Sequence, residues 1–106
     1  MNDAYTYIAD LAKAIEPPLD GTLSRTLFSD ERVKVVLFGF SAGQELSEHT
    51  STKPAIVQVL SGKALLTLGG DKVAAGPGSW IRMPAGLPHA VKAETPVIML
   101  LTLLKA

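Results

Sequence analysis

The sequence contains no cysteine, no excess of charge of either sign and no long apolar run. Without cysteine the chain has no disulfide, no thiolate metal ligand and no cysteine nucleophile, which is consistent with a reducing compartment. Ten acidic residues balance ten basic residues. No net charge therefore attracts nucleic acid or anionic lipid, and we expect neither as a partner.

We also expect neither a targeting segment nor a membrane-spanning segment. The N-terminal residues, which include Asn2, Asp3 and Asp10, lack the basic and apolar regions of a signal peptide. The apolar run from Val97 to Leu104 is too short to cross a bilayer as a helix. With 106 residues the chain forms one structural domain, and we expect a cytoplasmic protein.

One amphipathic helix is predicted near the N-terminus, over residues 3–15. Asn2 or Asp3 can cap its first turn, and Pro17 and Pro18 end it after Glu16. Its apolar stripe has three- and four-residue spacing and consists of Tyr5, Ile8, Ala12 and Ile15. Residues 1–20 are thus expected to be a helix and linker, ahead of a β-barrel over residues 21–106.

Short strands account for the remainder of the chain, separated by glycine and proline turns. The predicted strands are 22–28, 32–40, 44–50, 55–60, 63–68, 72–75, 79–83, a strand that opens with His89, and 97–104. The strands 55–60 and 63–68 are expected to form a hairpin across Ser61 and Gly62. This pattern predicts an all-β barrel or sandwich.

Two spaced motifs carry the candidate chemistry. In the first, Gly43 is followed by five residues and His49, then by Ser51, by Ala55, and after six more residues by Gly62. In the second, five residues separate Gly78 from Pro84, Gly86 follows, and His89 and Ala93 complete the spacing.

These motifs resemble the two motifs of the cupin superfamily. The second matches at the glycine, proline, glycine and histidine positions, with Ala93 at the position of an asparagine. The first keeps its frame, with Ser51 at the position of a second histidine and Ala55 at that of a glutamate. The resemblance implies a small, single-domain, RmlC-like jelly-roll β-barrel, with the N-terminal helix outside it.

Metal-bearing cupins hold a divalent cation with three histidines and one glutamate. The resemblance therefore marks His49 and His89 as metal ligands, for Zn, Ni, Fe or Mn. Two imidazoles are fewer ligands than zinc usually takes in proteins, so we expect weak or absent metal binding. The alternative is that both histidines are structural, hydrogen-bonded to the backbone or to water.

A pocket inside the barrel is the second expectation. Strand alternation directs both imidazoles into one cavity, which Ala55 and Ala93 should enlarge and dry. The expected pocket residues are His49, Ser51, Ala55, Val57, Val59, Trp80, His89, Val91, Ala93 and Met99. For Trp80, core packing is the preferred alternative. Such a cavity suits a small, mostly apolar molecule.

Three functions remain open at this point. The first is binding of that small molecule, and the second is a metal-dependent enzyme of the dioxygenase or isomerase type with unassigned catalytic residues. The third is a ligand-sensing module that needs a partner chain for its output. We also expect a homodimer, because strands 33–40 and 97–104 are apolar on both faces and one short helix cannot cover them.

Overall fold

Nine β-strands dominate the part of the chain that the structure describes, residues 4–105 of a computed structural model. They are β1 (Thr22–Ser29), β2 (Val33–Phe40), β3 (Glu45–His49), β4 (Ala55–Ser61), β5 (Ala64–Leu68), β6 (Asp71–Ala75), β7 (Trp80–Met83), β8 (His89–Ala93) and β9 (Val97–Leu104). Each lies close to a strand predicted from the alternation of apolar residues.

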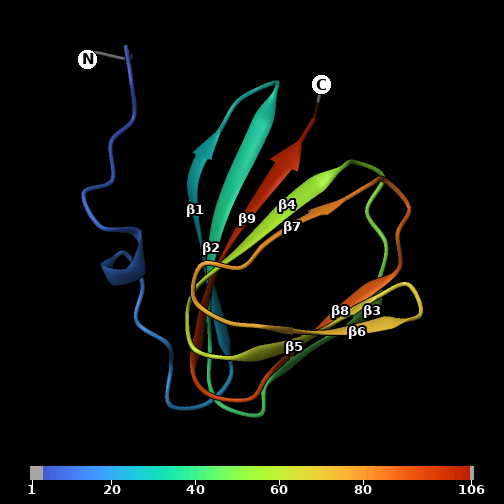
Figure 1. Ribbon diagram of the computed structural model, residues 1–106. Coiled ribbons are helices and arrows are strands. Elements are labelled where there is room, and N and C mark those ends of the chain that lie inside the picture. Colours follow the sequence, from blue (N-terminus) through green and yellow to red (C-terminus); the bar gives the residue numbers. More distant parts are fainter. Residues whose placement is uncertain (1–3, 106) are drawn as a thin grey trace.

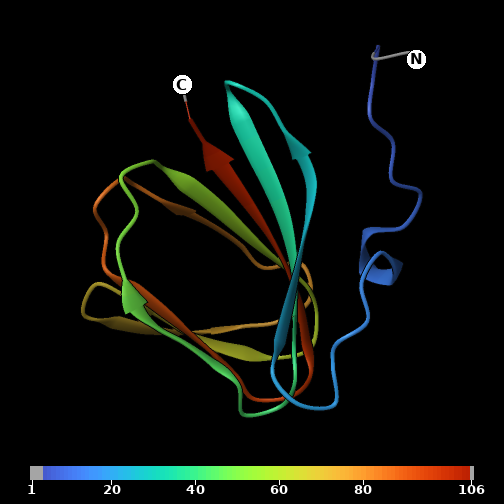
Figure 2. The same cartoon turned by 180° about the vertical axis from the view of Figure 1, so that it is seen from behind.

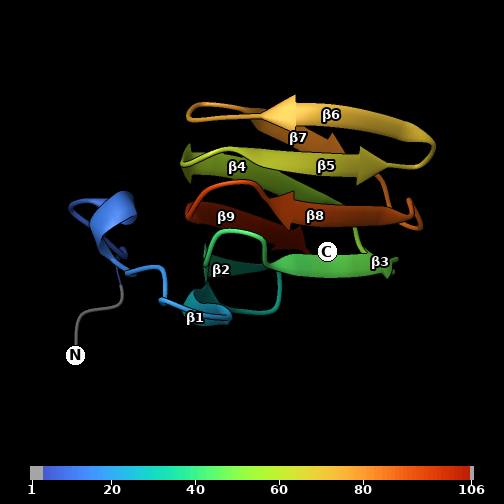
Figure 3. The same ribbon diagram turned by 90° about the horizontal axis from the view of Figure 1, so that it is seen from below.

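The strands form two antiparallel sheets that face each other (Figure 1, and from behind in Figure 2). The larger sheet has the order β1-β2-β9-β4-β7, and the smaller sheet has the order β3-β8-β5-β6. Figure 3, the view from below, shows the smaller sheet in front of the larger one. Figure 1 shows the N-terminal segment beside the larger sheet, on the side away from the smaller sheet. The predicted all-β jelly-roll architecture is confirmed.

The predicted hairpin across Ser61 and Gly62 is wrong. β4 pairs with β7 and β9, whereas β5 pairs with β6 and β8, so this turn carries the chain from the larger sheet to the smaller one. A glycine turn between two apolar strands suits a hairpin and a sheet-to-sheet corner equally well. In the structure both edges of β4 are paired, one with β7 and the other with β9, so β5 has no free edge of β4 to pair with.

The core lies between the sheets and is built from alternate residues of the strands. Its buried members are Phe40, Ala55, Val57, Val59, Ala64, Leu66, Ala75, Met83, Val91, Ala93, Val97 and Met99. Since side chains alternate along a strand, the intervening residues of the larger sheet point to its outer face. There Leu37, Ile98 and Leu100 form a second buried cluster.

The predicted N-terminal helix is wrong. Within the described residues this segment contains only a 3-10 turn, Leu11–Lys13; the cap expected at Asn2 or Asp3 lies outside them. Asp10 Oδ1 accepts a hydrogen bond from the Ala12 N–H at 3.2 Å, which begins a turn in the middle of the expected helix. Thr6, Tyr7 and Ile8 have poor helix propensity, which adds to this effect. No helix of the described residues is long and apolar enough to cross a membrane.

The segment around the turn nevertheless packs one member of the expected stripe, Ile15, against the barrel. Leu11, Ala14 and Ile15 pack on the outer cluster of the larger sheet, and Arg25 Nη1 donates to the Ala14 carbonyl at 2.8 Å. Tyr5, the first member of the stripe, is exposed. The N-terminal segment therefore covers one part of the outer face and leaves the rest uncovered.

Candidate functional site

The two histidines face each other across the β3–β8 pair. His49 lies directly opposite His89, and Leu46 opposite Val91. One extra residue of β3 therefore lies between these two pairs, which makes a β-bulge. Strict alternation would put Leu46 and His49 on opposite faces of the sheet. The bulge turns both side chains inward, where they line the same cavity.

The imidazole rings are close together and similarly held. Their centroids are 4.2 Å apart, with an angle of 61° between the ring planes. His49 Nδ1 is 2.8 Å from the Ser47 carbonyl, and His89 Nδ1 is 2.8 Å from the Leu87 carbonyl. Because a carbonyl only accepts, each Nδ1 carries a hydrogen that it donates. In the neutral ring this leaves a lone pair on Nε2 that can bind a donor or a metal.

A cavity of about 70 Å³ adjoins the two rings. His89 is half-buried in it, whereas His49 is exposed at its mouth. The lining is apolar apart from the imidazoles and consists of Phe38, Leu46, His49, Val57, Met83, His89, Val91, Met99 and Leu101. The arrangement thus places two imidazoles side by side at the border of one small apolar cavity.

Five of the ten expected pocket residues line this cavity. They are His49, Val57, His89, Val91 and Met99. Ala55, Val59 and Ala93 are buried in the core and do not line it. Ser51 is half-buried, and its hydroxyl accepts a hydrogen bond from the Lys53 N–H at 3.2 Å.

The expectation that Ala55 and Ala93 enlarge the barrel interior is wrong. Ala55 and Ala93 are almost fully buried, and neither of them lines the cavity beside the histidines. Ala55 lies opposite Met83 on β7 and opposite Leu103 on β9, and these long side chains belong to the same packed core. Close packing of the core therefore fills the volume that the smaller residues release.

Both expectations for Trp80, as a pocket residue and as a core residue, are wrong as well. Its side chain is 58% exposed, so it is neither a pocket residue nor a core residue. Trp80 lies opposite Gln58, in the register that puts Ile81 into the core and Trp80 on the outer face of the larger sheet. β7 has only four residues, so its sequence shows no clear alternation that would assign Trp80 to the outer face of the sheet.

The sequence did not point to four of the lining residues, namely Phe38, Leu46, Met83 and Leu101. β2 and β9 are apolar on both faces, so the sequence alone did not distinguish inward Phe38 and Leu101 from their neighbours. Leu46 faces inward together with His49 only because of the bulge. Met83 ends β7 just before the turn of the second motif, and its position before Pro84 was the available signal.

The donor set does not fit a tightly bound divalent cation. Two imidazoles are available, and the described residues contain no group of three or more His, Cys, Asp or Glu side chains placed to hold a metal ion. A catalytic zinc usually takes three protein ligands and a structural zinc four. Ser51, which the resemblance places at the position of another histidine ligand, does not line the cavity.

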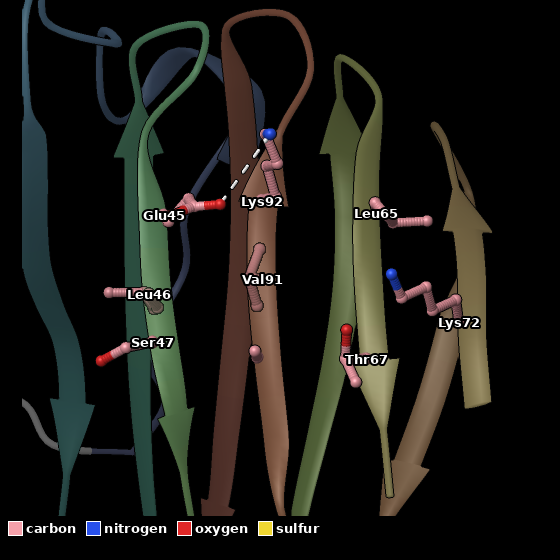
Figure 4. A pocket seen from close by; sticks show the side chains of 9 residues that line it. Glu45, Leu46, Ser47, Leu65, Thr67, Lys72, Val91 and Lys92 are labelled. Atoms are coloured by element: carbon pink, nitrogen blue, oxygen red, sulfur yellow. Dashed lines mark ion pairs between the residues drawn. The ribbon is translucent and has the colours of Figure 1, made fainter. Parts of the chain in front are cut away.

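A larger, open hollow of about 370 Å³ lies away from the histidines, on the outer face of the smaller sheet (Figure 4). Its charged side chains are Glu45, Lys72 and Lys92, and an ion pair of 3.9 Å joins Glu45 to Lys92. All three are exposed, as is usual on the solvated face of an antiparallel sheet. We therefore assign the candidate site to the smaller cavity, which both imidazoles line.

Two facing antiparallel sheets, with a histidine pair at the mouth between them, define a cupin-type barrel protein. The sequence model of the family described as "Cupin domain" matches residues 36–103, which include both histidines. The chain belongs to the cupin family. No curated protein matches the sequence.

Solved structures agree with this assignment. A conserved protein of unknown function from Streptococcus pyogenes is 34% identical, with a TM-score of 0.87 over 96% of this chain and 90% of that one. A cupin superfamily protein from Desulfitobacterium hafniense is 29% identical, with a TM-score of 0.86 over 91% and 88%. An RmlC-like cupin from Desulfovibrio desulfuricans is 26% identical, with a TM-score of 0.84 over 95% and 98%.

Proposed function

We propose that this cupin binds a small, mostly apolar molecule at the mouth of the barrel, between His49 and His89. The observation that carries the proposal is the pair of backbone-tethered imidazoles beside an apolar cavity. Apolar cavities with a few convergent polar groups are the usual form of small-molecule sites.

The polarity of the site narrows the ligand class. With both Nδ1 atoms donating to carbonyls, the two Nε2 atoms of the neutral rings act as acceptors. A ligand that matches them carries a hydrogen-bond donor, such as a hydroxyl or an amine, on an apolar body. An apolar molecule without a donor would leave both lone pairs without a partner, which costs free energy in a dry site.

The size of the cavity narrows the class further. Its volume of about 70 Å³ is roughly half of the ~150 Å³ cavity known to hold benzene. Only a few non-hydrogen atoms fit inside. The ligand is therefore either very small or inserts one end, with the remainder at the open mouth beside exposed His49.

A divalent-metal enzyme of the dioxygenase or isomerase type is the second candidate. The observation in its favour is that the two imidazoles lie 4.2 Å apart and line one cavity. The resemblance to metal-bearing cupins implies that histidines at these positions are metal ligands. Against it stands the shortage of further donors among the described residues. We derive no catalytic step through a metal from this site.

Metal analysis of untagged protein, purified without added metal, separates the two candidates. Our proposal expects well under one divalent ion per chain. It also expects small alcohols to bind to the wild type and to bind at least about tenfold more weakly to His89→Ala, because one of two acceptors is lost. Glu48→Ala is the matched control on the same strand, and it should bind like the wild type.

Two outcomes contradict the proposal. Near-stoichiometric Zn, Ni, Fe or Mn that disappears in His89→Ala would establish the metal centre instead. Equal binding of the alcohols to the wild type and to His89→Ala would show that they bind elsewhere.

A further inference from the structure

The cavity beside the histidines has its imidazoles on one side only. The smaller sheet contributes side chains of two neighbouring strands, which are Leu46 and His49 on β3 and His89 and Val91 on β8. The larger sheet contributes five apolar side chains, namely Phe38, Val57, Met83, Met99 and Leu101. A ligand in the cavity therefore meets both imidazoles on the β3–β8 side and apolar side chains elsewhere.

Met83 closes this cavity on the side away from His49. The strands of the larger sheet that line the cavity follow the order β2-β9-β4-β7. Figure 3 shows β3 in front of β2, β8 in front of β9 and β6 in front of β7. The strands β9 and β4 therefore lie between Met83 on β7 and the side from which β3 brings His49.

The side chain of Met83 forms a buried wall of the cavity. It is 3% exposed. Its register partner on β4 is Ala55, which is buried as well but does not line the cavity. Of these two neighbours, the longer side chain thus borders the space beside the histidines, and the length of Met83 limits how far that space extends toward β7.

Met83 is also the wall that can be changed with the least effect on the rest of the barrel. Among the described strands, β7 stands at the end of the larger sheet and pairs with β4 alone, whereas Met99 lies on β9 between β2 and β4. Phe38 stacks on the buried ring of Phe40 at a centroid distance of 5.9 Å. Methionine is unbranched and adapts to irregular gaps, so it suits a position that bounds a small cavity.

We propose that Met83 determines the length of the ligand, and that the ligand is a short aliphatic alcohol with its hydroxyl at the histidines and its chain toward Met83. This inference rests on the proposed binding of a small, mostly apolar molecule at the same site. The hydroxyl can donate to an imidazole Nε2, since both Nδ1 atoms donate to backbone carbonyls. The chain then lies against apolar side chains, where burial of each methylene group is favourable.

The volume of the cavity sets the expected chain length. It measures about 70 Å³, and a cavity of roughly 150 Å³ holds the six carbons of benzene, so about three carbon atoms fit. The wild-type chain should therefore bind methanol, ethanol and propanol with an affinity that rises about fourfold for each added carbon. From butanol onward the affinity should stop rising, because a longer chain meets Met83. NMR titration of the full chain with the straight-chain alcohols up to hexanol measures this profile.

Met83→Ala should extend the profile to longer alcohols. The change removes three heavy atoms from the end of the cavity and roughly doubles its volume. Hexanol should then bind at least about tenfold more tightly than it binds to the wild type. Met83→Leu keeps the volume of the side chain and should retain the wild-type profile.

Val97→Ala is the matched control for a truncation in the core. Val97 is fully buried on β9, opposite Phe40, and does not line the cavity. This variant should lose stability without any change in the preferred alcohol. A gain in hexanol affinity in Val97→Ala equal to that in Met83→Ala would overturn the role of Met83.

A measurement on the wild type tests the same inference if Met83→Ala fails to fold. Nuclear Overhauser effects should join the terminal methyl group of bound propanol to the Met83 methyl group, and the C1 protons of propanol to the ring protons of His89. The reverse pattern, or an identical chain-length profile in Met83→Ala and the wild type, would overturn the inference and leave the proposed binding intact. Failure of the wild type to bind any alcohol would overturn both.

Discussion

Each imidazole at the barrel mouth is oriented by the backbone carbonyl of the residue two positions before it in the chain. His49 donates to the carbonyl of Ser47, and His89 to the carbonyl of Leu87, both at 2.8 Å. The same local contact therefore occurs at two places far apart in the sequence. It fixes the ring orientation and the tautomer, as hydrogen bonds to the second nitrogen do for metal-binding histidines.

Ala55 stands where the first cupin motif has a glutamate, so Ala55→Glu restores that carboxylate. Ala55→Glu buries an acid in a site that is 2% exposed, so we expect a loss of about 1–3 kcal/mol in the free energy of unfolding without metal. Added Zn²⁺ or Ni²⁺ should recover part of this loss, because the carboxylate joins two imidazoles as a third ligand. Thermal melts with and without metal, together with calorimetric titration, measure both effects.

Ala75→Glu is the matched control for this change. Ala75 is a core residue with 5% exposure on β6, a strand that carries neither histidine. This variant should lose stability without any recovery by metal. Equal recovery in both variants would mean that the metal acts elsewhere, and no recovery in Ala55→Glu would show that this position does not reach the histidine pair.

Among the elements, the corner between β4 and β5 depends on one glycine. Gly62 has a φ of +83°, and a Cβ at this position would lie 2.0 Å from the carbonyl oxygen of Pro96. Gly62→Ala should therefore combine backbone strain with a steric clash. We expect a loss of at least about 2–4 kcal/mol in the free energy of unfolding, measured by urea denaturation.

Gly43 separates these two contributions. It has the same φ of +83°, but nothing lies within 4 Å of a Cβ built there. Gly43→Ala should cost only the backbone strain of about 1–2 kcal/mol. If both variants lost the same stability, the close approach of Pro96 would have no energetic effect.

The β1–β2 turn depends on the side chain of Asp30. Its Oδ1 accepts hydrogen bonds from the backbone N–H groups of Arg32 at 2.8 Å and Val33 at 2.9 Å, and these bonds lower the pKa of Asp30 below its usual 3.8. A carboxyl group with a lowered folded pKa stabilises the folded state above its unfolded pKa. We expect this contribution to be complete above about pH 4 and to be lost as the pH falls through the folded pKa.

NMR titration of the Asp30 carboxyl carbon checks the direction of this pKa shift. Asp30→Asn keeps an oxygen acceptor but cannot ionise, so its stability should fall less steeply with acid than that of the wild type. A midpoint at or above 3.8 for Asp30 would contradict the assigned hydrogen bonds.

The sequence predicted the strands well because each one carries its own alternation and turn residues. It could not predict the bulge in β3, since the extra residue appears only in the pairing with β8. The same limit explains the wrong hairpin. Whether a glycine corner returns the chain to the same sheet depends on β7 and β9, which come later in the sequence and occupy both edges of β4.

For the whole molecule, the fold and the histidine pair could be predicted, whereas the cavity and the N-terminal segment could not. The two motifs resemble those of cupins, and this resemblance, together with strand alternation, predicted that His49 and His89 point into one cavity. Cavity volume depends instead on how long side chains such as Met83 and Leu103 pack around Ala55. The N-terminal turn depends on a local contact of Asp10 that competes with the helix.

The central claim is that a small molecule binds between His49 and His89. The most direct test is to titrate the protein with a series of small alcohols and to follow the NMR chemical shifts of the whole chain. The chain has only two histidines, so the four ring nitrogens can be assigned from single variants. We predict Nδ1–H tautomers in both rings, and Nε2 shifts that follow one binding curve together with signals of Val57 and Met99. Rings that do not respond, or shifts confined to the open hollow around Lys72 and Lys92, would contradict the account.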